Sequence, residues 1–275
     1  MTRIAVLQMT SGIDPGANAA ALSEAIGRAA EGGAAMLFTP EMSGLLDRDR
    51  ARAAPHIVDE ASDPVLAAVR EAASRAGIWV ALGSIAVRGD SGKLANRSLV
   101  IDGSGAVAAR YDKIHMFDVS LDSGESWQES SAYQPGDAVV TVDTPVGRLG
   151  LTVCYDIRFP ALFEALGRAG CDIIAIPAAF TRPTGQAHWH LLQRARAIEA
   201  SAYVVAAAQC GRHEDGRETY GHSLVIDPWG EPLIDMGGDR PGLAFAEIEP
   251  ERIASVRRQL PSLANRRDIG KGARP

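Results

Sequence analysis

The chain has 275 residues, of which 46% are hydrophobic and 23% are charged. This composition is typical of a globular protein with a sizeable core, and it excludes disordered and fibrous classes. Its 28 basic and 34 acidic residues give a net charge of -6, which argues against a general nucleic-acid-binding protein.

Short apolar, β-branched runs separated by turn signals predict strands along the whole chain. In chain order they cover residues 3–9, 35–38, 78–87, 98–101, 139–142, 149–153, 172–176, 203–208, 223–226 and 243–248. Turn-forming segments at residues 102–105, 144–147 and 227–230 indicate hairpins between neighbouring runs.

Helical patterns cover residues 18–31, 64–76, 160–169, 186–200 and 250–260. The first ends at Gly32 and Gly33, and the second follows the candidate caps Ser62 and Asp63 and ends at Gly77. Helices alternate with strands only in part, because hairpins interrupt the alternation. This mixture favours two mixed sheets covered by helices over one doubly wound sheet.

No linker, charge run or low-complexity tract divides the chain, so we expect one domain over residues 1–275. A basic tail begins at about residue 266 and carries Arg266, Arg267, Lys271 and Arg274. The N-terminal apolar run is too short for a signal peptide, and no stretch approaches the roughly 20 apolar residues of a membrane helix. The three cysteines are too few and too scattered for a disulfide framework. A cytoplasmic protein without a membrane partner is expected.

Three predicted strands each lead to a residue with reactive chemistry. Glu41 follows a buried strand, and Lys113 follows a hairpin strand. Cys154 lies between a strand and a predicted helix, so helix-terminal N–H groups are expected to lower its thiol pKa. Taken singly, Glu41 also fits a turn cap, Lys113 a solvated charge and Cys154 a core thiol. Their occurrence together indicates a catalytic site.

Six short motifs surround and follow these residues. The first three are residues 38–41 (FTPE), 111–115 (YDKIH) and 153–159 (VCYDIRF), and the others are residues 185–190 (GQAHWH), 194–199 (RARAIE) and 221–230 (GHSLVIDPWG). In this order they resemble the nitrilase superfamily of carbon–nitrogen hydrolases, whose catalytic triad is Glu-Lys-Cys. The resemblance runs from residue 4 to about residue 267, which is nearly the whole chain.

This resemblance implies a fold and a set of roles. The fold is an α/β, four-layer α-β-β-α sandwich that usually pairs into a homodimer or a higher homo-oligomer. Glu41 would be the general base, Lys113 the stabiliser of the tetrahedral oxyanion and Cys154 the nucleophile. Glu129 would orient Lys113 or the substrate, and the backbone N–H of Tyr155 would share the oxyanion. The implied reaction is attack on an amide carbonyl, loss of an amine or ammonia, and hydrolysis of the thioester.

The substrate class rests on residues 206–213 (AAAQCGRH) and 220–223 (YGHS). They are similar to the deaminated-glutathione amidase branch, whose members cleave deaminated glutathione into 2-oxoglutarate and cysteinylglycine. The alternative is the ω-amidase branch, which acts on 2-oxoglutaramate. A 2-oxo acid carries a carboxylate that needs a cation, and Arg182 and Arg158 are the candidates.

Two other function classes fit parts of the sequence. A catalytically silent binding protein of the same fold is an alternative, but the intact Glu41, Lys113 and Cys154 argue against it. His188 and His190 lie two apart on a predicted helix and point about 200° apart, so they cannot share one ion. We therefore expect no metal and no cofactor, and a small-molecule amide as the partner.

Overall fold

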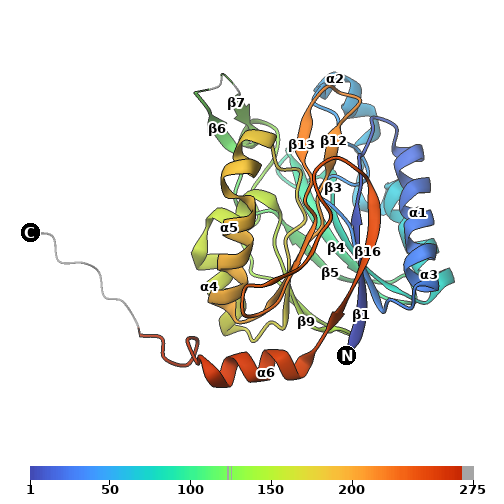
Figure 1. Ribbon diagram of the computed structural model, residues 1–275. Coiled ribbons are helices and arrows are strands. Elements are labelled where there is room, and N and C mark those ends of the chain that lie inside the picture. Colours follow the sequence, from blue (N-terminus) through green and yellow to red (C-terminus); the bar gives the residue numbers. More distant parts are fainter. Residues whose placement is uncertain (123, 125, 268–275) are drawn as a thin grey trace, which may run out of the picture.

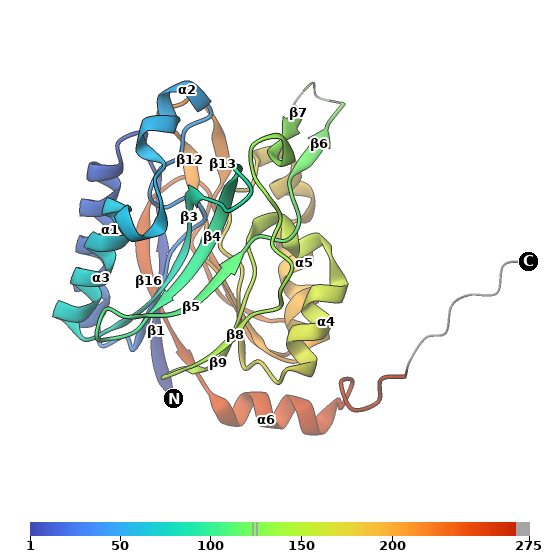
Figure 2. The same cartoon turned by 180° about the vertical axis from the view of Figure 1, so that it is seen from behind.

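The computed structural model describes residues 1–122, 124 and 126–267. Two six-stranded sheets pack face to face. Helices α1 (Pro15–Glu31) and α3 (Pro64–Ala76) cover the outer face of one sheet, and α4 (Pro160–Arg168) and α5 (Arg182–Ala200) cover the other (Figures 1 and 2). The predicted α-β-β-α sandwich is therefore confirmed.

The first sheet has the order β16-β1-β2-β3-β4-β5. Strands β1, β2 and β3 run parallel, and the other neighbours are antiparallel. The bounds are β1 (Thr2–Gln8), β2 (Met36–Phe38), β3 (Trp79–Arg88), β4 (Leu94–Ile101), β5 (Val107–Asp112) and β16 (Gly242–Ile248).

The second sheet has the order β15-β14-β11-β10-β9-β8, in which β9, β10 and β11 run parallel. Its strands are β8 (Thr141–Thr144), β9 (Gly147–Leu151), β10 (Ile173–Ala175), β11 (Tyr203–Ala206), β14 (Leu224–Ile226) and β15 (Pro232–Asp235). The last helix, α6 (Pro250–Gln259), follows β16 (Figure 1).

Strand β1 shows how the layers are joined. Its alternate side chains point to opposite faces, so Ile4 and Val6 lie in the core between the sheets, whereas Ala5 and Leu7 lie in the core under α1 and α3. All four are buried, which explains why the strand reads as a continuous apolar run.

Several elements differ from the sequence predictions. Strand β8 lies two residues later than expected, and α5 begins at Arg182 instead of residue 186. The sequence did not predict the hairpins β6 (Asp118–Ser120) with β7 (Ser126–Gln128) and β12 (Cys210–Arg212) with β13 (Glu218–Tyr220), nor α2 (Arg50–Ala53). These segments are polar and short, so they lack the apolar periodicity that marks a core element.

Four short 3-10 turns complete the described structure: η1 (Ala54–His56), η2 (Glu60–Ser62), η3 (Glu129–Ser131) and η4 (Cys154–Arg158). No helix in the described part of the chain is long and apolar enough to cross a membrane. At the start of the predicted basic tail, Arg266 donates to the carbonyl of Glu164 on α4 at 3.2 Å. Lys271 and Arg274 lie outside the described residues.

Candidate active site

The residues predicted to be catalytic meet at the carboxyl ends of three strands. Lys113 Nζ lies 3.1 Å from Glu41 Oε1 and 2.9 Å from Glu129 Oε2. The Cys154 thiol lies beside the Glu41 carboxylate, and each of the two groups shifts the pKa of the other. Glu41, Lys113 and Cys154 are each at most 8% exposed. The structure thus brings together four groups that are up to 113 positions apart in the sequence.

The position of Glu41 depends on a close approach of its loop to β3. A Cβ atom on Gly83 would lie 2.1 Å from the carbonyl oxygen of Thr39 and 2.3 Å from that of Pro40, so only glycine allows this contact. The Gly83 N–H donates to Thr39 Oγ1 at 3.0 Å, and the β3–β4 register shifts between Leu82 and Ile85. This irregularity holds the chain that carries Glu41 against the sheet.

Lys113 is a buried cation between two carboxylates. Its ammonium contacts both oxygens of Glu129, and Glu129 Oε2 also accepts the N–H of Phe117 at 2.7 Å. Burial lowers the pKa of Lys113, but the charges of Glu129 and Glu41 outweigh it and raise this pKa well above its ordinary value. Lys113 is therefore charged at any working pH.

Sequence reasoning missed Asn96, which bridges the two acids. Its Nδ2 donates to Glu41 Oε1 at 2.9 Å and to Glu129 Oε1 at 3.2 Å, from the middle of β4. The available signal was its strand position, because a polar residue one step from the helix-facing Ala95 points between the sheets.

Cys154 adopts a left-handed backbone conformation, with φ of 50°, where β9 gives way to η4. Non-glycine residues rarely adopt this strained conformation, and those that do are concentrated at functional sites. The backbone N–H of Cys154 donates to the carbonyl oxygen of Pro177 at 2.8 Å, and this hydrogen bond fixes the turn.

The expectation of a lowered thiol pKa is wrong. Burial and the negative charge of Glu41 raise the pKa of Cys154 well above its ordinary value, although Lys113 lowers it. A thiolate here would lose its hydration and lie beside a carboxylate, and one ammonium shared by two acids does not compensate. The resting group is a neutral thiol.

Glu41 is the complementary acceptor. Burial raises its pKa, but the charge of Lys113 and the hydrogen bonds from Cys154, Asn96 and Lys113 bring it below the ordinary carboxyl value. Its Oε2 also accepts the N–H of Ala179 at 2.8 Å. An ionised carboxylate beside a protonated thiol is the arrangement expected of a general base and its nucleophile.

The backbone N–H of Tyr155, the residue after Cys154, is available as a hydrogen-bond donor at the same centre. Tyr155 occupies the first turn of η4, where N–H groups have no partner in the helix, and no described backbone carbonyl accepts its N–H. Its ring packs edge-on against Phe117 and Phe159, with centroid distances of 5.1 and 5.4 Å, and lines the cavity described below.

A second buried acid, Asp156, joins the cysteine segment to the lysine segment. One of its oxygens accepts the N–H of Val153 at 2.8 Å and the hydroxyl of Tyr111 at 2.7 Å, and the other accepts the N–H of His115 at 3.0 Å. Because Tyr111 and His115 flank Lys113, Asp156 fixes the nucleophile relative to the cation. Sequence reasoning did not single it out.

A cavity of about 1150 Å³ opens onto the four catalytic candidates. Apolar side chains such as Leu45, Phe117 and Phe180 line it, together with the indole of Trp127. Besides Lys113, its walls carry six cations, namely Arg48, Arg50, Arg88, Lys93, Arg182 and Arg217. The cavity therefore suits an extended molecule that carries negative charge.

The two arginines predicted to bind the substrate carboxylate have other contacts. Arg182 lines the cavity, but its guanidinium pairs with Asp239 and lies 3.7 Å from Glu218. Arg158 lies over the rings of Tyr155 and Phe180, and it is not among the described residues that line the cavity.

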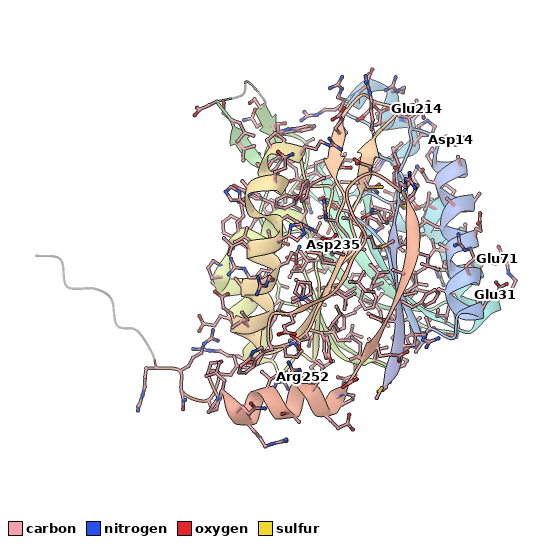
Figure 3. The ribbon with its side chains drawn as sticks, in the orientation of Figure 1. Asp14, Glu31, Glu71, Glu214, Asp235 and Arg252 are labelled. Atoms are coloured by element: carbon pink, nitrogen blue, oxygen red, sulfur yellow. The ribbon has the colours of Figure 1, made fainter. Side chains whose placement is uncertain are left out.

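One group in the described part of the chain has the side chains to hold a metal ion: His190, His222 and Asp235. Asp235, which is labelled in Figure 3, accepts hydrogen bonds from His190 Nε2 at 3.0 Å and from His222 Nδ1 at 2.8 Å. The group is thus satisfied internally, and none of its members lines the cavity. His188 contacts Arg158 instead, so it points away from His190 as predicted.

Comparison with known proteins places the chain in a family. The model of the carbon–nitrogen hydrolase family matches residues 3–258. Deaminated glutathione amidases of Yersinia enterocolitica and Homo sapiens are 42% and 40% identical to the chain, over 97% and 96% of it and over 93% and 82% of their own lengths. The crystal structure of the C. elegans NitFhit protein superposes with a TM-score of 0.89 at 38% identity, covering 97% of this chain but 65% of that one. The chain therefore belongs to the carbon–nitrogen hydrolase family.

Proposed function

We propose that the protein is a thiol amidase that hydrolyses deaminated glutathione through a thioester on Cys154. The observation that carries this proposal is the buried contact between an ionised Glu41 and a protonated Cys154 thiol, beside Lys113 and at the wall of a large cavity. The relatives named deaminated glutathione amidase support the substrate.

Acylation begins when the amide carbonyl of the substrate reaches the thiol. Glu41 takes the thiol proton as the sulfur of Cys154 forms its bond to the carbonyl carbon. Lys113 and the N–H of Tyr155 stabilise the negative oxygen of the tetrahedral intermediate. The C–N bond then breaks, Glu41 returns the proton to the leaving nitrogen, and the amine departs as cysteinylglycine.

Deacylation uses the same groups with water in place of the amine. Glu41 takes a proton from water while the oxygen attacks the thioester carbon of Cys154. Lys113 again faces the oxyanion, held by Glu129 from its other side. The C–S bond breaks, the thiol regains its proton from Glu41, and 2-oxoglutarate leaves. One amide and one water give one acid and one amine.

Lys113→Met should lower kcat by at least about 100-fold, the scale typical of removing one oxyanion stabiliser. The loss also leaves Glu41 and Glu129 facing each other without the cation between them, so the melting temperature should be measured together with kcat. A folded Lys113→Met protein with near-normal kcat would remove this lysine from the mechanism.

Side-by-side kinetics on three substrate types test the proposed function. We expect kcat/KM for deaminated glutathione to exceed that for 2-oxoglutaramate, and nitriles to be turned over poorly because a linear nitrile carbon aligns badly for this attack. A preference for 2-oxoglutaramate would indicate an ω-amidase, and a preference for nitriles would overturn the amidase assignment. Inactivity on every substrate would indicate a silent binding protein.

The single-domain organisation over residues 1–275, the homodimer or higher homo-oligomer and the cytoplasmic location remain predictions. Exposed apolar side chains on α5 and around the β14–β15 turn support self-association: Leu191 is 70% exposed, Leu233 49% and Trp229 45%. Analytical ultracentrifugation of the full chain measures the oligomeric state.

A further inference from the structure

Arg217 is a fixed cation in the wall of the cavity. It directly precedes β13, in the β12–β13 hairpin that the sequence did not predict. Its Nε donates to Asp215 Oδ2 at 2.9 Å, and its guanidinium lies 5.0 Å from the centre of the Trp127 ring. Its side chain is 18% exposed. A guanidinium held at one edge and along one face loses little conformational freedom on binding a ligand.

Asp215 orients this arginine and leaves its outer edge free. The Asp215 side chain is fully buried, and it also accepts the backbone N–H groups of Arg48 and Arg217, at 2.9 and 3.0 Å. Among the described residues, no side chain or carbonyl accepts from the two terminal nitrogens of Arg217. Two adjacent N–H donors in one plane are the pattern that binds a carboxylate bidentately.

The charges of the catalytic centre make such a cation necessary for an acidic substrate. Two carboxylates, Glu41 and Glu129, face one ammonium there, so with a neutral thiol the centre carries a net charge of -1. A substrate carboxylate is repelled from this centre in a buried, weakly screened site. It must therefore bind at some distance, beside a positive group.

The end of the cavity near the β12–β13 hairpin carries cations that are less neutralised by ion pairs than Arg182 is. Arg182 is opposed by two carboxylates, Asp239 and Glu218, whereas among the described residues Arg217 forms an ion pair only with the buried Asp215 and interacts more weakly with the charge of Asp47. The Arg48 guanidinium lies beside Gly216 in the same hairpin, and no described carboxylate forms an ion pair with it. Figure 3 shows Glu214, in the turn of this hairpin, at the same end of the molecule as α2.

We propose that Arg217, oriented by Asp215 and Trp127, binds a carboxylate of the substrate and so selects acidic amides over neutral ones. This inference rests on the proposed amidase function and assigns its substrate-binding cation to Arg217 instead of Arg182 or Arg158. Deaminated glutathione has one carboxylate at its 2-oxo acid end and another at its glycine end, and 2-oxoglutaramate has only the first.

The experiment compares Arg217→Gln and Arg217→Lys with the wild type. The matched control is Arg212→Gln, an exposed arginine of the same hairpin that does not line the cavity. The substrates are deaminated glutathione, 2-oxoglutaramate, and the pair glutaramate and valeramide, which differ in having or lacking a carboxylate. In Arg217→Gln, KM for deaminated glutathione should rise about 10- to 100-fold, the scale of a hydrogen bond to a charged group, with little change in kcat.

The neutral valeramide should lose no kcat/KM, and Arg217→Lys should keep part of the affinity because lysine preserves the charge but not the bidentate geometry. A rise in KM for both acidic substrates would assign the 2-oxo acid carboxylate to Arg217, and a rise for deaminated glutathione alone would assign the glycine carboxylate. Unchanged KM for both, or an equal loss on valeramide, would overturn the proposal.

The glutaramate–valeramide pair separates this proposal from the proposed function. If the wild type does not hydrolyse deaminated glutathione, the proposed substrate fails. In that case the preference for glutaramate over valeramide still reports on Arg217: its loss in Arg217→Gln supports the carboxylate site, and its persistence together with an unchanged KM for 2-oxoglutaramate contradicts it.

Discussion

Cys154→Ala is expected to reduce amide hydrolysis by at least about 10⁴-fold, because no other group can form the acyl intermediate. The fold should survive the change. Alanine occupies a smaller volume at the same left-handed backbone position, and Glu41 keeps its hydrogen bonds from Asn96, Lys113 and Ala179. Steady-state turnover and trapping of an acyl adduct by mass spectrometry measure the loss.

The other two cysteines supply matched controls. Cys171 and Cys210 are buried away from the cavity, and burial raises the pKa of Cys171 to about 12. Their alanine variants should retain most of the activity and form the same adduct. If Cys154→Ala turned over amides at a rate comparable to these controls, the thioester mechanism would be wrong.

Glu41→Gln should lower kcat by about 10²- to 10⁴-fold, the range typical of removing a general base. Glutamine has nearly the same shape, but its amide cannot take the proton of a thiol whose pKa is already raised by burial. The damage should therefore appear in kcat with the melting temperature close to that of the wild type. Near-normal kcat would exclude Glu41 as the base.

The pH profile of the wild type checks the same role. Glu41 must be ionised to act, and its pKa lies below the ordinary value of 4.5, so kcat/KM should persist as the pH falls to about that value and be lost only below it. The Cys154 pKa lies well above 9.0, so thiol ionisation should add no rise in activity at neutral pH. An acid limb centred well above pH 4.5 would contradict the assignment of Glu41.

Local signals in the sequence determined many of the elements. Helix α3 spans Pro64–Ala76 as predicted, because Asp63 caps its first turn and Gly77 adopts the left-handed conformation that ends it. The apolar runs predicted most of the sheet strands, since strand alternation and burial are properties of neighbouring residues. The order of Glu41, Lys113 and Cys154 within recognisable motifs also identified the candidate catalytic groups and the family.

Tertiary structure decided what depends on which elements meet. The thiol pKa of Cys154 rises because folding places a carboxylate beside it and removes water, although its place before a helix predicts the opposite. Asn96 and Asp156 become part of the site only when β4 and η4 are brought to the lysine segment. Arg182 forms ion pairs with two carboxylates and Arg217 with one buried carboxylate, so the cation available to a substrate could not be chosen from the sequence. Electrostatic energies depend on distance and burial, and both are set by contacts between residues far apart in the chain.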